Sequence, residues 1–504
     1  MPQSPTPLTP PTADAEPLFS FRGLGLSYRA KPALRGINWD WIPGQHWAIL
    51  GPNGAGKTTL ASILTGEQKH YSGDYIPSER LRRGGVAYVC FERGALLCER
   101  DRKRDCAEYE SSASDTGTRV RELLPLSGDN EQAWQTLVDM LELGSILDRG
   151  LRYISTGEMR KTLLASALLS EPELLILDSP LDGLDKATQA RLASALSTII
   201  QSSQAVMLLC RSAEDVPEGC THLMLLDRGR TVAQGERLPL LNSEVVSRVL
   251  RAPAIQFSPP PTRASAPVPQ DDTATLELRN VSVSFGEHCV FKDLNWRLDR
   301  HQHCLIAGPN GSGKSTLLDL LTGDNHKAYG QQVDLFGRRR GTGESVWDIK
   351  ARFGRVDSRM QFQVPNGSKV EGVVLSGFFS SLGLHDRPSD QQRSQAKRWL
   401  QSLGLAALAG EEFHTLSFGI QRLVLLARAM VKDPVILLLD EATISLDAGH
   451  RRLLLDAVDH VVAEGRCQLL FVSHTAGERP LCINQILNFI PAEGGSTVAI
   501  ESSA

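Results

Sequence analysis

Three short motifs occur twice in this chain, in the same order and at nearly constant spacing. The copies are GPNGAGKTT and GPNGSGKST at residues 51–59 and 308–316, ISTGEMR and LSFGIQR at 154–160 and 416–422, and LLILD and ILLLD ending at Asp178 and Asp440. The second copy of the first motif lies 257 residues after the first copy, and the other two motifs repeat after 262 residues. A period this long indicates two duplicated domains, because solenoid repeats are much shorter.

Proline is concentrated in two segments of the chain. Of the 27 prolines, six lie in residues 1–17 and six in residues 253–269, and both segments are rich in Ser, Thr and Ala. This composition is typical of a disordered tail and an extended linker. The predicted organisation is a tail at 1–17, a first domain at 18–251, a linker at 252–272 and a second domain at 273–504.

Composition excludes several classes of protein. The 54 Lys and Arg residues nearly balance 58 Asp and Glu, which argues against a polycation that coats nucleic acid. No apolar stretch approaches the roughly 20 residues of a membrane span, and residues 1–17 lack the features of a signal peptide. Nine cysteines without a CxxC pair predict neither a disulfide framework nor a zinc site. We expect a cytoplasmic protein, or one peripheral at the cytoplasmic face of the inner membrane.

Each half has a glycine loop between a predicted strand and a predicted helix. Apolar residues 48–50 and 305–307 precede the loops, and Leu60, Ile63 and Leu64 have helical spacing after the first loop. Strands that alternate with helices predict an α/β fold with a mostly parallel sheet.

The glycine loops have the GxxxxGK[ST] pattern that binds phosphates. Glycines let backbone N–H groups turn toward anionic oxygens, the lysine reaches the outer phosphates, and the following hydroxyl binds Mg²⁺. The candidate phosphate-binding residues are Gly51, Pro52, Asn53, Gly54, Ala55, Gly56, Lys57, Thr58 and Thr59 in the first half and Gly308, Pro309, Asn310, Gly311, Ser312, Gly313, Lys314, Ser315 and Thr316 in the second. Asp178 and Asp440 end apolar runs, so the candidate Mg²⁺ ligands are Thr58, Asp178, Ser315 and Asp440.

Together the repeated motifs resemble those of ATP-binding-cassette (ABC) ATPases, over nearly the whole chain outside the tail and linker. The resemblance implies two tandem phosphate-loop ATPase domains, each with a mostly parallel core sheet, an antiparallel β subdomain and a helical signature subdomain. It also implies ATP and Mg²⁺ as cofactors. In the family, two cassettes pack head to tail, and each ATP lies between the phosphate loop of one and the signature of the other.

Further site residues follow from the same resemblance. The signature residues are Ser155 and Gly157 in the first half and Ser417 and Gly419 in the second, the aspartates of the SALD-like loops are Asp185 and Asp447, and the aromatic residues at the adenine-stacking positions are Tyr28 and Phe285. The signatures depart from the family pattern at Thr156, Glu158, Phe418 and Ile420. Either aromatic residue could instead pack in the core as part of a strand.

The two halves differ where hydrolysis takes place. Asp440 is followed by Glu441, which the resemblance makes the residue that polarises the attacking water, and His474 is its switch histidine. The corresponding positions in the first half hold Ser179 and Arg211. We therefore expect hydrolysis at the second phosphate loop and an impaired site at the first.

The sequence leaves the partner of this ATPase open. The glutamine that usually couples a cassette to its membrane partner is missing near Phe91 and Ser358, and Gln361 is displaced from that position. Within the family, residues 346–358, 99–105 and 221–230 resemble the ModF (photorepair PhrA-like) tandem cassette proteins, which are associated with molybdate transport. A permease subunit is then the expected partner, with no strong nucleic-acid signal. The alternatives are a soluble role in translation or ribosome regulation, or in DNA repair or stress response. The cassettes could pair within one chain or in a homodimer.

Charged runs are a separate question in this sequence. We expect Arg338–Arg340 and the mixed run at 99–104 to form solvated loop faces, because charge runs most often do.

Overall fold

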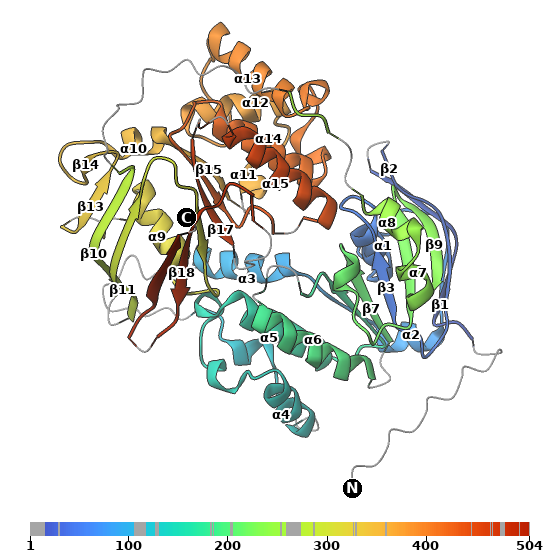
Figure 1. Ribbon diagram of the computed structural model, residues 1–504. Helices are drawn as coiled ribbons and strands as arrows, with labels where there is room; N and C mark the ends of the chain where they lie inside the picture. Colours follow the sequence, from blue (N-terminus) through green and yellow to red (C-terminus); the bar gives the residue numbers. More distant parts are fainter. Residues whose placement is uncertain are drawn as a thin grey trace. The chain divides into compact units, whose positions relative to one another are not determined.

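The computed structural model divides the chain into two compact units, Met1–Arg251 and Ala252–Ala504 (Figure 1). It describes residues 16–28, 31–104, 117–126, 131–181, 184, 186–201, 205–251, 255–258, 274–285, 288–325, 327, 330–357, 360–444, 446–463, 465, 467–473, 479–492 and 494–502.

A six-stranded sheet forms the centre of the first unit. Its strands, in spatial order, are β5 (Val86–Val89), β6 (Leu174–Asp178), β7 (Ala205–Cys210), β3 (Trp47–Leu50), β8 (His222–Asp227) and β9 (Arg230–Glu236). All neighbouring pairs are parallel except β8 and β9. The run Trp47–Leu50 is buried throughout, as expected for an inner parallel strand that is covered on both faces.

An antiparallel sheet of three strands completes the β structure of this unit. The strands are β2 (Lys31–Trp41), β1 (Phe19–Tyr28) and β4 (Ser72–Pro77), in this spatial order. Aromatic side chains pack between this sheet and the central one: Trp39 lies edge-on to Trp47 of β3, with ring centroids 5.1 Å apart. Phe19 and Phe21 of β1 are fully buried, and both rings contact Trp39 in this aromatic cluster.

The helices of the first unit follow the strands along the chain. They are α1 (Lys57–Leu64), α2 (Glu79–Gly84), α3 (Phe91–Arg104), α4 (Glu131–Met140), α5 (Thr156–Leu168), α6 (Lys186–Gln201), α7 (Arg237–Leu241) and α8 (Glu244–Val249). One apolar core contains residues of α4, α5 and α6 together with one face of the central sheet.

The second unit repeats this architecture. Its central sheet has the order β15 (Phe353–Asp357), β16 (Ile436–Asp440), β17 (Gln468–Ser473), β12 (Cys304–Ala307), β18 (Gln485–Ile490) and β19 (Thr497–Ser502). Its antiparallel sheet has the order β11 (His288–Leu298), β10 (Leu276–Phe285), β13 (Gln332–Leu335) and β14 (Arg338–Arg339). The strand order of the central sheet is the same in both units, which confirms the predicted fold class.

The helices of the second unit form the helical part that the sequence predicted. They are α9 (Lys314–Thr322), α10 (Val346–Arg352), α11 (Met360–Gln363), α12 (Val370–Leu375), α13 (Asp390–Ser402), α14 (Phe418–Met430) and α15 (Ala448–Val462). Helices α12, α13 and α15 each pack against α14 (Figure 1). Most residues of α14 are therefore buried.

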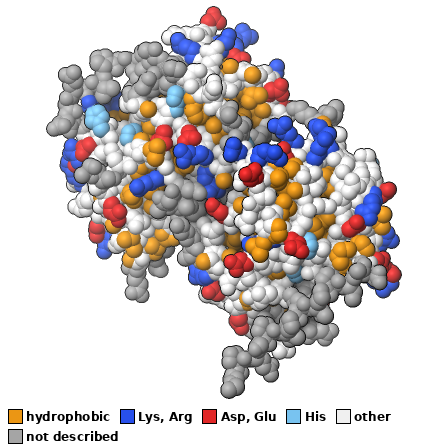
Figure 2. Space-filling model, turned by 45° about the vertical axis from the view of Figure 1, so that its right-hand side comes forward, with side chains coloured by type: hydrophobic (Ala, Val, Ile, Leu, Met, Phe, Trp, Pro, Cys, Tyr) orange, Lys and Arg blue, Asp and Glu red, His pale blue; other side chains and the backbone are white. Residues whose placement is uncertain are grey.

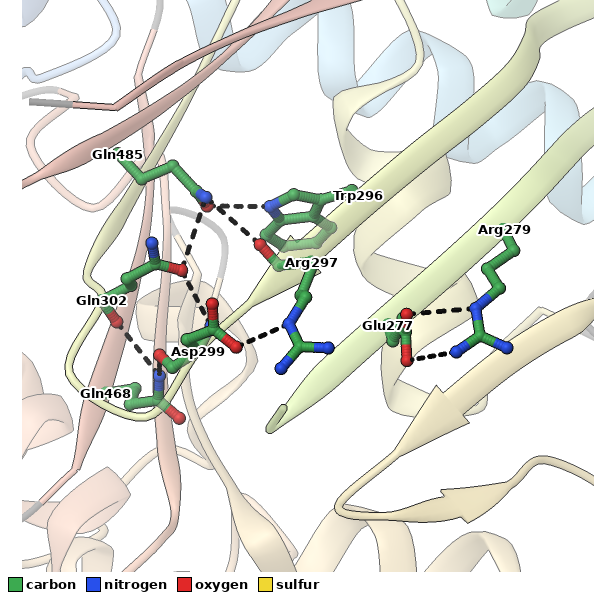
Figure 3. A network of polar contacts seen from close by, with 8 residues as sticks. All are labelled: Glu277, Arg279, Trp296, Arg297, Asp299, Gln302, Gln468 and Gln485. Atoms are coloured by element: carbon green, nitrogen blue, oxygen red, sulfur yellow. Dashed lines mark hydrogen bonds and ion pairs between the residues drawn. The ribbon is translucent and has the colours of Figure 1, made fainter. Parts of the chain in front are cut away.

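A polar network joins the antiparallel sheet of the second unit to its central sheet (Figure 3). Trp296 of β11 donates its indole N–H to Gln485 of β18 at 2.8 Å, and the Gln485 amide donates to the Arg297 carbonyl at 3.2 Å. Gln468 of β17 donates to the Asp299 carbonyl at 2.6 Å. Because buried amides need partners, this network fixes the two sheets at this end.

Part of the predicted linker packs against the second unit. Ser258 donates its backbone N–H to the Ser402 carbonyl, and its own carbonyl accepts hydrogen bonds from the Ser402 hydroxyl and the His460 ring. The Phe257 ring stacks on His460, with centroids 5.3 Å apart.

The charged runs are only partly solvated. Arg338 and Arg339 are exposed in β14, but Arg340 is 6% exposed and donates to the Leu320 carbonyl. Residues 99–104 lie in α3 and not in the expected loop; Glu99 and Arg100 are exposed as expected, but Asp101 is buried. Elsewhere, exposed basic and acidic side chains are interspersed on the face drawn in Figure 2. Within the described residues, no helix has the length and apolar character needed to cross a membrane.

Candidate functional site

Both glycine loops end in the same backbone conformation. Gly56 and Gly313 precede α1 and α9 with φ of +104°, a region that other residues avoid. At Gly56 a Cβ atom would lie 2.8 Å from the Ala33 carbonyl oxygen, so the loop also packs too closely for a side chain. The residues predicted to bind phosphate thus form two matching turns, each at the N-terminus of a helix.

The two lysines point into these turns. Lys57 donates to the carbonyls of Gly51 and Pro52 at 2.5 and 3.0 Å, and both atoms belong to its own loop. Lys314 does the same with Gly308 and Pro309 at 2.8 and 2.7 Å. Each loop therefore surrounds a nearly buried ammonium group, which is the arrangement needed to hold a polyanion.

The first unit brings its two candidate Mg²⁺ ligands together. Thr58, at the start of α1, donates its hydroxyl to Asp178 at the end of β6, with 3.1 Å between Oγ1 and Oδ2. A hydroxyl and a carboxylate are hard oxygen ligands of the type that Mg²⁺ prefers, so the residues present fit the ion. Cys210 lies near this site at the end of β7, and burial raises the pKa of its thiol well above the ordinary value. It therefore stays uncharged.

The second unit surrounds Asp440 differently. Ser315 is exposed at the start of α9, and Asp440 is buried at the end of β16. Asp357 is its neighbour in the sheet register, so two carboxylates lie at this edge. Arg355 forms ion pairs with both, at 3.6 Å to Asp440 and 3.2 Å to Asp357. The oxygen ligands again suit Mg²⁺, with an arginine beside them.

Sequence reasoning missed the side chain that contacts each of these aspartates from the neighbouring strand. Tyr88 of β5 donates its hydroxyl to Asp178 at 2.9 Å, and Arg355 occupies the same register position in β15. These contacts join neighbouring strands that are far apart in the sequence. Only the strand order of the sheet could have revealed them. A phenol hydroxyl therefore contacts Asp178 in the first unit, and a guanidinium contacts Asp440 in the second.

Arg355 also reaches two acidic groups of the α9 region. Its guanidinium lies 3.6 Å from both Asp319 and Asp324. Burial raises the pKa of Asp324, but hydrogen bonds from Lys350 and Thr322 and the charges of Lys350 and Arg355 outweigh it, so the pKa stays below the ordinary value. Asp324 is therefore ionised at neutral pH.

The residue after each aspartate has the same strained backbone. Ser179 and Glu441 have φ of +48° and +50°, which is unusual for residues other than glycine. Their N–H groups donate to equivalent carbonyls, of Leu209 at 2.9 Å and Val472 at 3.2 Å. The Ser179 hydroxyl contacts Asp178 at 3.2 Å. The two units thus present different side chains from one backbone geometry.

The signature serines begin two long helices. Ser155 and Glu158 form a capping box at the start of α5, with hydrogen bonds of 2.7 and 3.2 Å. This accounts for Glu158, which departs from the family pattern, because it satisfies the serine N–H. Ser417 caps α14 and accepts the Ile420 N–H at 3.5 Å. Both serines therefore lie at the positive end of a helix.

The structure places most of the other residues that were predicted from the sequence. Tyr28 and Phe285 end β1 and β10 and are each 49% exposed, so neither is part of the core. Arg211 follows β7 in the position expected from the repeat. Asp185 and His474 lie outside the described residues. Gln361 is 2% exposed on α11, and neither of its amide atoms has a partner among the residues described.

Two phosphate-loop units with capped signature helices define a class of nucleotide-binding proteins. The ABC transporter family matches residues 34–182 and 291–444, and the chain belongs to this family. It therefore belongs to a family of ATPases that bind ATP, typically with Mg²⁺.

Among relatives, the chain is 36% identical over 458 residues to the ABC transporter ATP-binding protein ModF of Escherichia coli (strain K12). The match covers 90% of this chain and 92% of that protein, which confirms the resemblance to ModF-type proteins. An uncharacterized ABC transporter ATP-binding protein of Schizosaccharomyces pombe is 24% identical, covering 90% of this chain and 94% of the relative.

Solved structures show the same fold at lower identity. One, described as "Model of ribosome-bound archaeal Pelota and ABCE1", has a TM-score of 0.60 at 20% identity, covering 91% of this chain and 75% of its own. Another, described as "RNase-L Inhibitor", has a TM-score of 0.56 at 19% identity, covering 95% and 90%. At these identities the likeness concerns the fold alone.

Proposed function

We propose that this protein binds Mg²⁺ and ATP at both phosphate loops and hydrolyses ATP mainly at the second. One observation carries the proposal. Ser179 and Glu441 share a backbone conformation and a hydrogen-bonded N–H, but only Glu441 has a carboxylate that can polarise water. Arg211 in place of a histidine further weakens the first site, with His474 as its counterpart in the second.

Different residues of each unit bind the phosphates, the Mg²⁺ ion and the adenine of the nucleotide. Lys57 and Lys314 exchange their loop carbonyls for phosphate oxygens, since the ammonium groups already lie inside the loops. Thr58 with Asp178, and Ser315 with Asp440, hold Mg²⁺, which neutralises charge on the phosphates. Tyr28 and Phe285 are exposed and can stack on the adenine.

We further propose that each ATP is held between one phosphate loop and the signature of the other unit, within one chain or between chains. The first loop would then pair with Ser417 and Gly419, and the second with Ser155 and Gly157. The capped helix starts at Ser155 and Ser417 support this assignment, because a helix N-terminus attracts the γ-phosphate.

For the biological role, we propose an ATP-binding component of ModF type, linked to molybdate-type transport through a permease subunit. The 36% identity over 90% of the chain supports this role. A role in translation or in DNA repair is the alternative. The Pro-rich linker argues against the long helical insertion of ribosome-associated cassette proteins.

Capture of the ATP-bound protein is expected to recover a permease subunit. The Glu441→Gln variant with Mg²⁺ and ATP should accumulate the bound state, because the residue that polarises water is lost. Affinity capture followed by mass spectrometry identifies the partner, and a Lys57→Ala/Lys314→Ala variant that cannot hold the phosphates is the matched control. Permease subunits recovered only with Glu441→Gln support the transport role, whereas ribosomal proteins recovered in their place would contradict it.

A further inference from the structure

A serine, a histidine and an aspartate are joined by hydrogen bonds in the second unit. Ser417 Oγ lies 3.3 Å from His450 Nε2, and His450 Nδ1 lies 2.8 Å from Asp447 Oδ2. The His450 N–H also donates to Asp447, which caps α15. Asp447 is 2% and His450 7% exposed, so solvent does not compete for these contacts. The imidazole thus bridges the signature and the SALD-like loop.

The signature glycine creates the space for this imidazole. A Cβ atom on Gly419 would lie 2.0 Å from His450 Cδ2, so the ring is packed directly on the first turn of α14. The equivalent position in the first unit, 262 residues earlier, holds Thr188, whose methyl group lies over Gly157. A threonine has one hydroxyl and is too short to bridge two side chains as an imidazole does. Sequence reasoning missed His450, although a histidine three residues after a capping aspartate is visible in the sequence.

The chemistry of the three side chains determines which atoms of this group donate hydrogen bonds and which accept them. An ionised carboxylate only accepts, so Asp447 places a hydrogen on His450 Nδ1. In the tautomer that carries its hydrogen on Nδ1, Nε2 is an acceptor, and the Ser417 hydroxyl donates to it. Ser417 Oγ meanwhile accepts the Ile420 N–H. The one hydrogen of the hydroxyl is therefore directed at His450.

Hydrolases use the same three residue types to activate a nucleophilic serine. Here the serine oxygen already caps a helix, and its 3.3 Å contact with the ring is long. A regulatory role fits this geometry better, because a γ-phosphate oxygen can only accept and needs the hydrogen that His450 takes.

We propose that His450 and the γ-phosphate of ATP compete for the Ser417 hydroxyl, so that His450 restrains ATP binding at the signature of the second unit. This inference rests on the proposed function, which places Ser417 against the nucleotide at the first phosphate loop. His450 acts through Ser417 and is a positioning residue. ADP lacks the γ-phosphate, so the restraint applies to ATP alone.

The His450→Asn variant tests this competition. The asparagine amide can replace Nδ1–H toward Asp447 but does not reach Ser417, so the hydroxyl is released. We expect the Kd for Mg·ATP to fall about three- to tenfold, as for loss of one competing hydrogen bond, with the Kd for Mg·ADP unchanged. Equilibrium binding is measured on the full chain carrying Lys314→Ala, which leaves only the first phosphate loop able to hold nucleotide.

A double-mutant cycle with Ser417→Ala separates competition from structural damage. In the Ser417→Ala background, His450→Asn should no longer change the Kd for ATP, because the serine through which it acts is absent. Equal or weaker ATP binding by His450→Asn alone overturns the proposal. His450→Thr, which copies the first unit, provides a second variant and should show the same tightening.

The Ser417→Ala variant alone also tests the proposed function. If it leaves the Kd for ATP unchanged, Ser417 does not contact the nucleotide and the composite site is wrong. If it weakens ATP binding while His450→Asn does not alter the ratio of the ATP and ADP constants, only the competition is wrong.

Discussion

Replacement of Glu441 by glutamine is expected to lower the steady-state ATPase rate of this protein by about 10²–10⁴-fold, whereas Ser179→Ala leaves most of the activity. The two positions have the same backbone, with φ of +50° and +48°, so the comparison changes only the side chain. Glutamine preserves size and hydrogen bonding but cannot accept a proton from water. Serine at neutral pH is not a base, so its loss removes no step of hydrolysis.

The assignment of the active half depends on nucleotide still being bound in both variants. ATP binding should be measured with each variant, and the Kd should remain within about threefold of the unsubstituted protein because the phosphate loops are unchanged. If Glu441→Gln retained most of its activity while binding ATP normally, hydrolysis would have to occur elsewhere. A large loss in Ser179→Ala alone would instead identify the first loop as the active one.

The phosphate loops could be predicted because their requirements are local. Glycines at positions of positive φ, a lysine and a hydroxyl all lie within nine residues, and the structure folds both loops alike. The strand that ends at Asp178 was also visible, because an apolar run that ends in a carboxylate has a pattern of its own. What repeats in the sequence therefore also repeats in the fold.

Local sequence patterns could not predict contacts between segments that are distant along the chain. Tyr88 reaches Asp178 across 90 residues, and this depends on β5 lying beside β6 in the sheet. His450 reaches Ser417 because α15 packs against α14, which no local pattern specifies. The charged run at 99–104 reads as a loop, but Glu, Lys and Arg are good helix formers and it lies in α3. The charge of this run predicted that Asp101 is exposed, but Asp101 is buried.

A second large effect is expected at the last glycine of the second phosphate loop. Gly313→Ala should lower the free energy of opening of β12 and α9 by about 2–4 kcal/mol, because two costs combine. Its φ of +104° is strained for any side chain, and the new Cβ would lie 2.7 Å from Val290 Cγ1. The loop turns around Lys314 at this point, so ATP binding by the second unit should be lost with it.

Gly311→Ala is the matched control, since it separates strain from crowding within the same loop. Gly311 has φ of +79°, and no atom lies within 4 Å of the place that a Cβ would occupy, so only the backbone strain of about 1–2 kcal/mol applies. Amide hydrogen exchange is the suitable measurement, because a chain with two units need not unfold in one step, and exchange reports on β12 and α9 directly. Protection in these elements should fall more in Gly313→Ala than in Gly311→Ala. An equal loss of protection in both variants would mean that the contact with Val290 relaxes without cost. The backbone conformation would then be the only reason that position 313 requires glycine.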